Sequence, residues 1–115
     1  MNHYILKNAQ VYTETAKIEN GYIEVRDGYI YDIQEGEYKG DAQSVDLKGQ
    51  HLLPGFIDIH IHGGYGQDAM DATPEALNIL SEKLLSEGTT SFLATTMTQS
   101  AEAVSDALEN VANYK

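Results

Sequence analysis

The sequence predicts an α/β protein in two parts: short strands up to residue 52, then a strand, a helix, a second strand and a second helix. Two observations support this prediction. Residues 4–47 contain several short β-forming segments separated by turn residues. After residue 55 the spacing of apolar residues changes from alternating to helical and back. Strand and helix in alternation are the repeat of a parallel α/β fold.

The N-terminal part is expected to form short strands, two of which are joined in a hairpin. The dipeptide Asp27-Gly28 separates two alternating segments, which is a strong hairpin signal because both turn positions require a positive φ. The expected strands are Tyr4–Leu6, Ala9–Tyr12, Gly21–Arg26, Tyr29–Ile33 and Ser44–Leu47.

The stretch Leu53–Gly64 holds the candidate metal ligands. If it is a strand, its side chains alternate, so that Asp58, His60 and His62 share one face and three isoleucines share the other. The two histidines are then about 6.5–7 Å apart at their α-carbons. Both rings can reach a single ion at about 2.0–2.1 Å. Polar residues in such an apolar strand are costly to bury unless they are paired or ligated, so His60 and His62 are predicted to bind a metal.

The neighbours of these histidines allow more than one role. Asp58 could orient a ligating histidine from the second coordination shell, or it could make structural hydrogen bonds in its own strand. Gly63 and Gly64 could bring the main chain close to a substrate. The string H-G-G-Y-G has too little basic character and lacks glycine-loop spacing, so a tight loop is favoured over a phosphate loop.

The remaining residues predict helix, strand and helix. Thr73 is a suitable N-cap before Pro74, an apolar stripe follows, and Gly88 is a suitable C-terminal stop. The stripe consists of Leu77, Leu80 and Leu84. A strand is expected over Thr89–Thr96, and a second amphipathic helix from about Ser100, marked by Val104, Leu108 and Val111. Thr95, Thr96 and Thr98 are interpreted as strand-end hydrogen-bonding groups rather than as catalytic groups.

Composition narrows the classes of function. The 115 residues include 18 acidic and 7 basic side chains, for a formal net charge of −11. This charge argues against nucleic acids and anionic membranes as partners. There is no cysteine, which excludes disulfides and thiolate metal sites. No apolar run is long enough for a membrane span, and the N-terminus does not resemble a signal peptide, so a cytoplasmic protein is expected.

The motif P-G-F-I-D-x-H-x-H followed by glycine resembles the amidohydrolase superfamily. Within it, H-G-G-Y-G and G-T-T-S-F-L-A-T-T are similar to the N-acetylglucosamine-6-phosphate deacetylase family. The resemblance implies that residues 1–52 are part of an N-terminal β-sandwich. It also implies that residues 53–115 are the first two βα units of a (β/α)₈ TIM barrel.

The resemblance also implies an activity: metal-dependent hydrolysis of the N-acetyl group of N-acetylglucosamine 6-phosphate, giving glucosamine 6-phosphate and acetate. His60 and His62 match the family's metal ligands, and the divalent metal is expected to be zinc or iron. The implied partners are the amino-sugar phosphate substrate and further copies of the chain in a homo-oligomer. The family's general base, an aspartate, and its other ligands have no counterpart among these residues, so the catalytic residues are expected downstream.

Chain length adds a further expectation. A complete barrel needs about 250 residues, whereas 65 residues follow residue 50. The chain is therefore expected to be the front of a longer enzyme or a truncated product, and to be inactive alone. Two alternatives remain: a non-catalytic fragment or interaction module, and another amidohydrolase such as a dihydroorotase-like cyclic amidase.

Overall fold

The structure, a computed structural model, describes residues 2–114. The chain forms two compact units, Met1–Pro54 and Gly55–Lys115. Among the described residues, no helix combines the length and the apolar character needed to cross a membrane.

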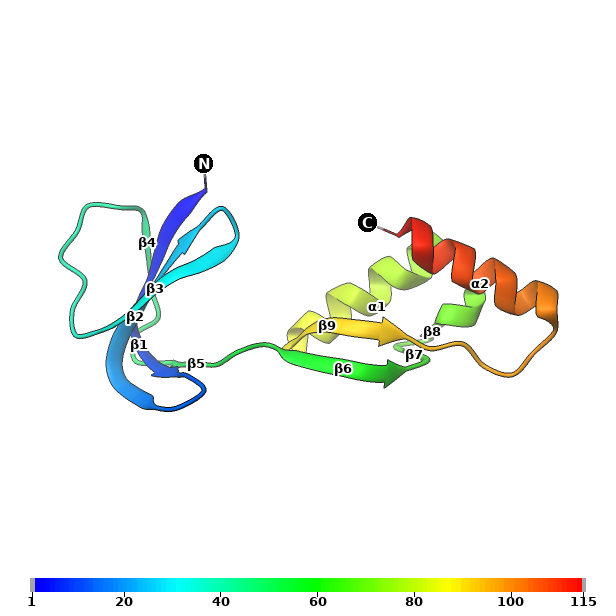
Figure 1. The fold of residues 1–115 in the computed structure, drawn as a ribbon, viewed down its shortest axis with the longest axis horizontal. Coiled ribbons are helices and arrows are strands. Elements are labelled where there is room, and N and C mark those ends of the chain that lie inside the picture. Colours follow the sequence, from blue (N-terminus) through cyan, green and yellow to red (C-terminus); the bar gives the residue numbers. More distant parts are fainter. Residues whose placement is uncertain (1, 115) are drawn as a thin grey trace. The chain divides into compact units, whose positions relative to one another are not determined.

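The first unit is a five-stranded sheet. Three antiparallel strands lie in the order β3-β2-β1, and two short strands pair in parallel with different parts of β1 (Figure 1). The strands are β1 (His3–Tyr12), β2 (Lys17–Arg26), β3 (Tyr29–Glu35), β4 (Ser44–Asp46) and β5 (His51–Leu52). Asp27 and Gly28 have φ values of 50° and 84°. The predicted hairpin between β2 and β3 is therefore confirmed.

The first two predicted segments form one strand rather than two. β1 continues from His3 to Tyr12, and its register with β2 shifts between Leu6 and Ala9. Asn8, inside this shift, has a φ of 56°, a conformation that asparagine tolerates better than most residues. Four buried residues of β1 and β2 form one core cluster, namely Ala9, Val11, Ile23 and Val25, and Ile5 of β1 is also fully buried.

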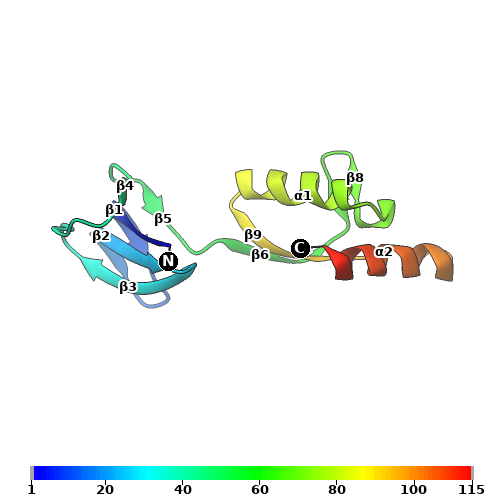
Figure 2. The same cartoon turned by 90° about the horizontal axis from the view of Figure 1, so that it is seen from above.

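The second unit is built on two parallel strands and two helices. β6 (Phe56–Ile61) and β9 (Thr89–Ala94) run side by side in the same direction, and α1 (Pro74–Ser86) connects them and packs on β9 (Figure 1). Figure 2 shows α1 lying along this two-stranded ribbon. Between β6 and α1 the chain forms β7 (Gly63–Gly64), β8 (Gln67–Asp68) and the 3₁₀ turn η1 (Ala69–Asp71), and α2 (Ala101–Asn113) follows β9. The predicted mixed α/β fold is confirmed.

Helix α1 begins and ends where its cap residues predict. The Thr73 side chain accepts a hydrogen bond from the Ala76 N–H, and Pro74 occupies the first turn. Gly88, just beyond the helix, has a φ of 84°. The predicted stripe is buried, since Leu77, Leu80 and Leu84 are all at most 5% exposed.

Helix α2 begins close to the predicted start at Ser100, and two of its three predicted stripe residues, Val104 and Val111, are partly buried. The Ser100 side chain caps the helix by accepting a hydrogen bond from the Ala103 N–H. Leu108, expected on the packed stripe, is 55% exposed, whereas Ala107 is fully buried. Neighbouring helical positions lie about 100° apart around the axis. Among the elements of the unit, the helix packs mainly on η1.

Candidate metal site

His60 and His62 come together at the carboxyl end of β6. His60 belongs to the strand and is exposed, and His62 follows the last strand residue and is partly buried. Their ring centroids are 5.2 Å apart and the ring planes cross at 78°. The predicted proximity of the two imidazoles is therefore present. In barrel enzymes, functional side chains lie at this end of the strands.

The ring of His62 is held by the main chain that follows β9. Its Nδ1 lies 2.9 Å from the carbonyl oxygen of Thr95. A carbonyl oxygen can only accept, so Nδ1 carries the hydrogen and Nε2 keeps a free lone pair. The Thr95 N–H also donates to the Ile61 carbonyl, at 2.8 Å. Two hydrogen bonds thus fix the position of His62 and leave Nε2 available as a metal ligand.

Thr95 contributes to this site through its main chain. The predicted strand end at Thr96 is too long by two residues, since β9 ends at Ala94. The Thr95 hydroxyl donates to the Leu93 carbonyl at 3.2 Å, which agrees with the predicted local hydrogen bonding at the strand end. The sequence could not predict that the Thr95 carbonyl holds His62, because every residue has a main-chain carbonyl.

Asp58 bonds within its own strand. Its Oδ1 accepts from the main-chain N–H of His60 at 3.0 Å. The pairing of β6 with β9 is irregular here, because Asp58 pairs with Phe92 and Ile61 pairs with Ala94. Three residue steps in β6 thus correspond to two in β9, so β6 contains a bulge. The regular pairing assumed in the prediction of strict alternation is therefore interrupted between Asp58 and Ile61.

Gly63 and Gly64 form a very short hairpin directly after His62. Gly63 pairs with Asp68 and Gly64 with Gln67. The turn between them uses Tyr65 and Gly66, whose φ values are 57° and 79°. A Cβ on Gly63 would clash with the main chain of Gln67 and Asp68, whereas one on Gly64 would only reach Leu80, at 3.7 Å. The favoured interpretation as a tight loop agrees with this geometry.

The donor set fits zinc or iron in part. Imidazole is a good ligand for both metals, and His62 presents a free Nε2. Within residues 2–114 there is no group of three or more histidine, cysteine or acidic side chains that could share an ion. Metal sites in proteins use three or four ligands, so this pair needs further donors. The other two histidines bond within the first unit, His3 to Glu24 at 2.7 Å and His51 to Tyr12 at 2.9 Å.

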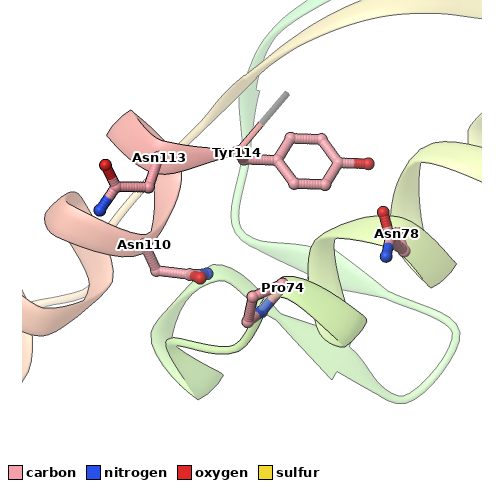
Figure 3. Close-up of a pocket in the computed structure, with 5 residues that line it drawn as sticks. All are labelled: Pro74, Asn78, Asn110, Asn113 and Tyr114. Atoms are coloured by element: carbon pink, nitrogen blue, oxygen red, sulfur yellow. The ribbon is translucent and has the colours of Figure 1, made fainter.

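A separate pocket of about 270 Å³ lies between the helices, and it contains none of the predicted site residues. Its lining is largely amide and phenol: Pro74, Asn78, Asn110, Asn113 and Tyr114 (Figure 3). In Figure 3 the Tyr114 ring extends toward α1, where its hydroxyl lies 2.8 Å from the Ser81 hydroxyl. This contact joins the C-terminal end of α2 to α1.

Residues 51–114 match the model of the amidohydrolase family. The chain belongs to the amidohydrolase family. This stretch contains β6, both histidines and the loop after them, so the match includes the whole candidate metal site of this amidohydrolase chain.

Three individual relatives show which amidohydrolases this chain is similar to. The chain is 44% identical over 119 residues to the N-acetylglucosamine-6-phosphate deacetylase of Bacillus subtilis (strain 168), covering 96% of this chain and 28% of that protein. It is 43% identical over 96 residues to the deacetylase of the same name from Lysinibacillus sphaericus, covering 84% of this chain and 25% of that protein. A dihydroorotase of Listeria innocua is 34% identical over 59 residues, which cover 51% of this chain and 14% of that protein.

A solved structure shows the same fold. The crystal structure of N-acetylglucosamine-6-phosphate deacetylase from Pasteurella multocida matches with a TM-score of 0.87 and 31% sequence identity. The match covers 99% of this chain and 32% of the solved chain. The chain thus spans between a quarter and a third of the length of these deacetylases.

Proposed function

We propose that this chain supplies the N-terminal part of a metal-dependent N-acetylglucosamine-6-phosphate deacetylase. The proposed reaction hydrolyses the acetamide of the substrate and gives glucosamine 6-phosphate and acetate. The observation that carries the proposal is the pair of imidazoles at the end of β6, with rings 5.2 Å apart. The two bacterial relatives described above, at 43–44% identity, are deacetylases of this name and support it.

The two units have separate places in the proposed enzyme. We infer that residues 1–52 belong to an N-terminal β-sandwich and that residues 53–115 form the first two βα units of a (β/α)₈ barrel. The parallel pairing of β6 with β9 across helix α1 supports the second assignment. In such a barrel the carboxyl ends of the strands form the active site, which is where His60 and His62 lie.

Each site residue has a defined task in this proposal. His60 and the Nε2 of His62 bind the divalent metal, zinc or iron, and Thr95 keeps the proton on Nδ1 of His62. The bound metal would activate water and polarise the amide carbonyl. Gly63 and Gly64 place the loop after β6 at the rim of the site, beside the substrate. The remaining ligands and the general base are assigned to parts of the enzyme beyond these residues.

The proposal also covers the location, the oligomerisation and the partners of the protein. A cytoplasmic enzyme that forms homo-oligomers and takes an amino-sugar phosphate is proposed, with neither nucleic acid nor membrane as a partner. The net charge of −11 supports the exclusion of polyanionic partners. The 115 residues alone are expected to be inactive, because two ligands hold a metal weakly.

A chimera tests whether this chain can supply its part of the site. The aligned segment of the Bacillus subtilis deacetylase is replaced by residues 1–115, and acetate release from N-acetylglucosamine 6-phosphate is measured with zinc or iron added. The chimera is expected to be active. His62→Ala in the chimera should lower kcat/KM by about a hundredfold or more, because a metal ligand is lost.

The matched control is His51→Ala, since His51 bonds to Tyr12 within the first unit. This variant should retain activity close to that of the chimera. A folded chimera that binds metal but releases no acetate would contradict the proposal. Activity that is insensitive to both His60→Ala and His62→Ala would contradict the assignment of the ligands.

A second candidate activity is hydrolysis of a cyclic amide. The 34% identity to a dihydroorotase favours it, although this match covers only half of the chain. The protein purified from its source cells distinguishes the two reactions when N-acetylglucosamine 6-phosphate and dihydroorotate are compared at equal concentration. Deacetylation alone is expected. If the protein turns over only dihydroorotate, the proposed substrate is wrong and the cyclic amide takes its place.

A further inference from the structure

We propose that Asp58 is a positioning residue for His60, and that it acts through the main chain rather than through its charge. The Asp58 side chain holds the His60 N–H inside the bulge of β6 and thereby directs the His60 imidazole toward His62. This inference rests on the proposed metal site and adds to it a residue that does not itself bind the ion.

The bulge creates the need for such a residue. In regular pairing the pleat determines the face on which each side chain lies. Between Asp58 and Ile61 this constraint is lost, because β6 carries one residue more than the Phe92–Ala94 segment of β9. His60 lies within the irregular segment. Its side-chain direction must therefore be set by a local contact.

The contact that sets it is the hydrogen bond of 3.0 Å from the His60 N–H to Asp58 Oδ1. An aspartate that accepts from the main chain two residues further on fixes the local backbone in the manner of an Asx turn. Asp58 is itself partly buried, which limits competition from water.

The two histidines are held in different ways. The His62 ring is fixed directly by the Thr95 carbonyl. Within residues 2–114 the His60 ring has no hydrogen-bond partner and contacts His62 edge to face. The direction of the His60 ring therefore depends on its backbone, and its backbone depends on Asp58.

Two substitutions separate the hydrogen bond of Asp58 from the effect of its charge. The Asp58 contact needs one oxygen acceptor at this position, and the amide oxygen of asparagine supplies one. Leucine has nearly the same shape as asparagine but no acceptor. Asp58→Asn and Asp58→Leu remove the same charge, so a difference between them isolates the hydrogen bond from the Coulomb attraction of the ion.

The test uses the full 115-residue chain with Zn²⁺ as the probe. Zinc affinity is measured by titration calorimetry, and hydrogen exchange of the His60 amide is measured by NMR without metal. Asp58→Leu is expected to bind zinc about tenfold more weakly than Asp58→Asn, in the range found for groups that orient ligands. The His60 amide should exchange slowly in the wild type and in Asp58→Asn, and faster in Asp58→Leu.

Equal zinc affinities for the asparagine and leucine variants would overturn the inference, as would equal exchange rates. If circular dichroism shows that Asp58→Leu does not fold, Asp58→Ala replaces it with the same expectations. His60→Ala tests the proposed ligand itself: unchanged zinc affinity would remove the metal role of His60 and this inference with it. If the chimera has no deacetylase activity but the zinc result is as expected, the proposed substrate is refuted and the positioning role of Asp58 stands.

Discussion

At the scale of single residues, the site depends on which nitrogen of His62 carries the proton. The Thr95 carbonyl can only accept, so the hydrogen must be on Nδ1. We expect nitrogen-15 NMR of the side chains to show the Nδ1–H tautomer for the neutral ring of His62. Added Zn²⁺ should then perturb Nε2 and leave the Nδ1–H in place.

The His60 ring is the internal control for this measurement. It has no hydrogen-bond partner within residues 2–114, so its tautomer is not fixed by the protein. A dominant Nε2–H tautomer for His62 would contradict the Thr95 contact. Zinc bound through Nδ1 of His62 would contradict the assignment of the ligand atom.

The same residues show what the sequence could predict. The pairing of His60 with His62 followed from the short spacing along one strand, and the structure brings the rings together. The Thr95 contact could not be predicted, because a main-chain carbonyl is common to all residues. For Asp58 the sequence leaves two roles open, orienting a ligating histidine or bonding within its own strand. The bulge beside Asp58 cannot be predicted from the sequence, because it depends on the register with β9.

At the scale of elements, the hairpin of β7 and β8 sets the exit of the chain from the site. Gly63 has no room for a side chain, because a Cβ would come within 2.7 Å of the Asp68 Cα. Gly64 has room, with Leu80 as its nearest neighbour. Gly63→Ala is expected to lower the free energy of unfolding by about 1–3 kcal/mol, as overpacking does. Thermal unfolding followed by circular dichroism measures this loss.

Gly64→Ala is the matched control, one residue away in the same hairpin. It should change the free energy of unfolding by less than about 0.5 kcal/mol, because its new methyl group makes only an ordinary contact. Gly63 also follows His62 directly, so Gly63→Ala should weaken zinc binding more than Gly64→Ala does. Equal effects of the two substitutions on stability would show that the hairpin is not packed as described.

Elements with strong local signals were predicted well. Thr73 and Gly88 mark the two ends of α1, because caps act within a few residues of the chain. The sequence does not predict the exposure of Leu108, because the packed face of α2 depends on its contact with η1. The 3₁₀ turn η1 has three residues and no periodic pattern, so its role as a packing partner is visible only in three dimensions.

At the scale of the whole molecule, the second unit exposes apolar side chains on both of its parallel strands. Ile57 and Ile59 of β6 are 67% and 73% exposed, and Leu93 of β9 is 60% exposed. Parallel strands are normally covered on both faces. We expect the 115-residue chain to associate with itself as its concentration rises, and the double variant Ile57→Thr/Ile59→Thr to reduce this association. Analytical ultracentrifugation over a range of concentrations measures both effects.

Charge gives this prediction a second test. A net charge of −11 makes the copies repel one another. Salt screens that repulsion over a distance of about 10 Å at 0.1 M ionic strength, so added salt should strengthen association driven by apolar contact.

Threonine keeps the β-branched shape that suits a strand. Leu85→Gln, at a 59% exposed position of α1, removes a comparable apolar side chain away from the strands and should leave association unchanged. If the chain stays monomeric at every concentration and salt level, or if Leu85→Gln acts as strongly as the double variant, the exposed face of β6 is not the surface through which copies meet.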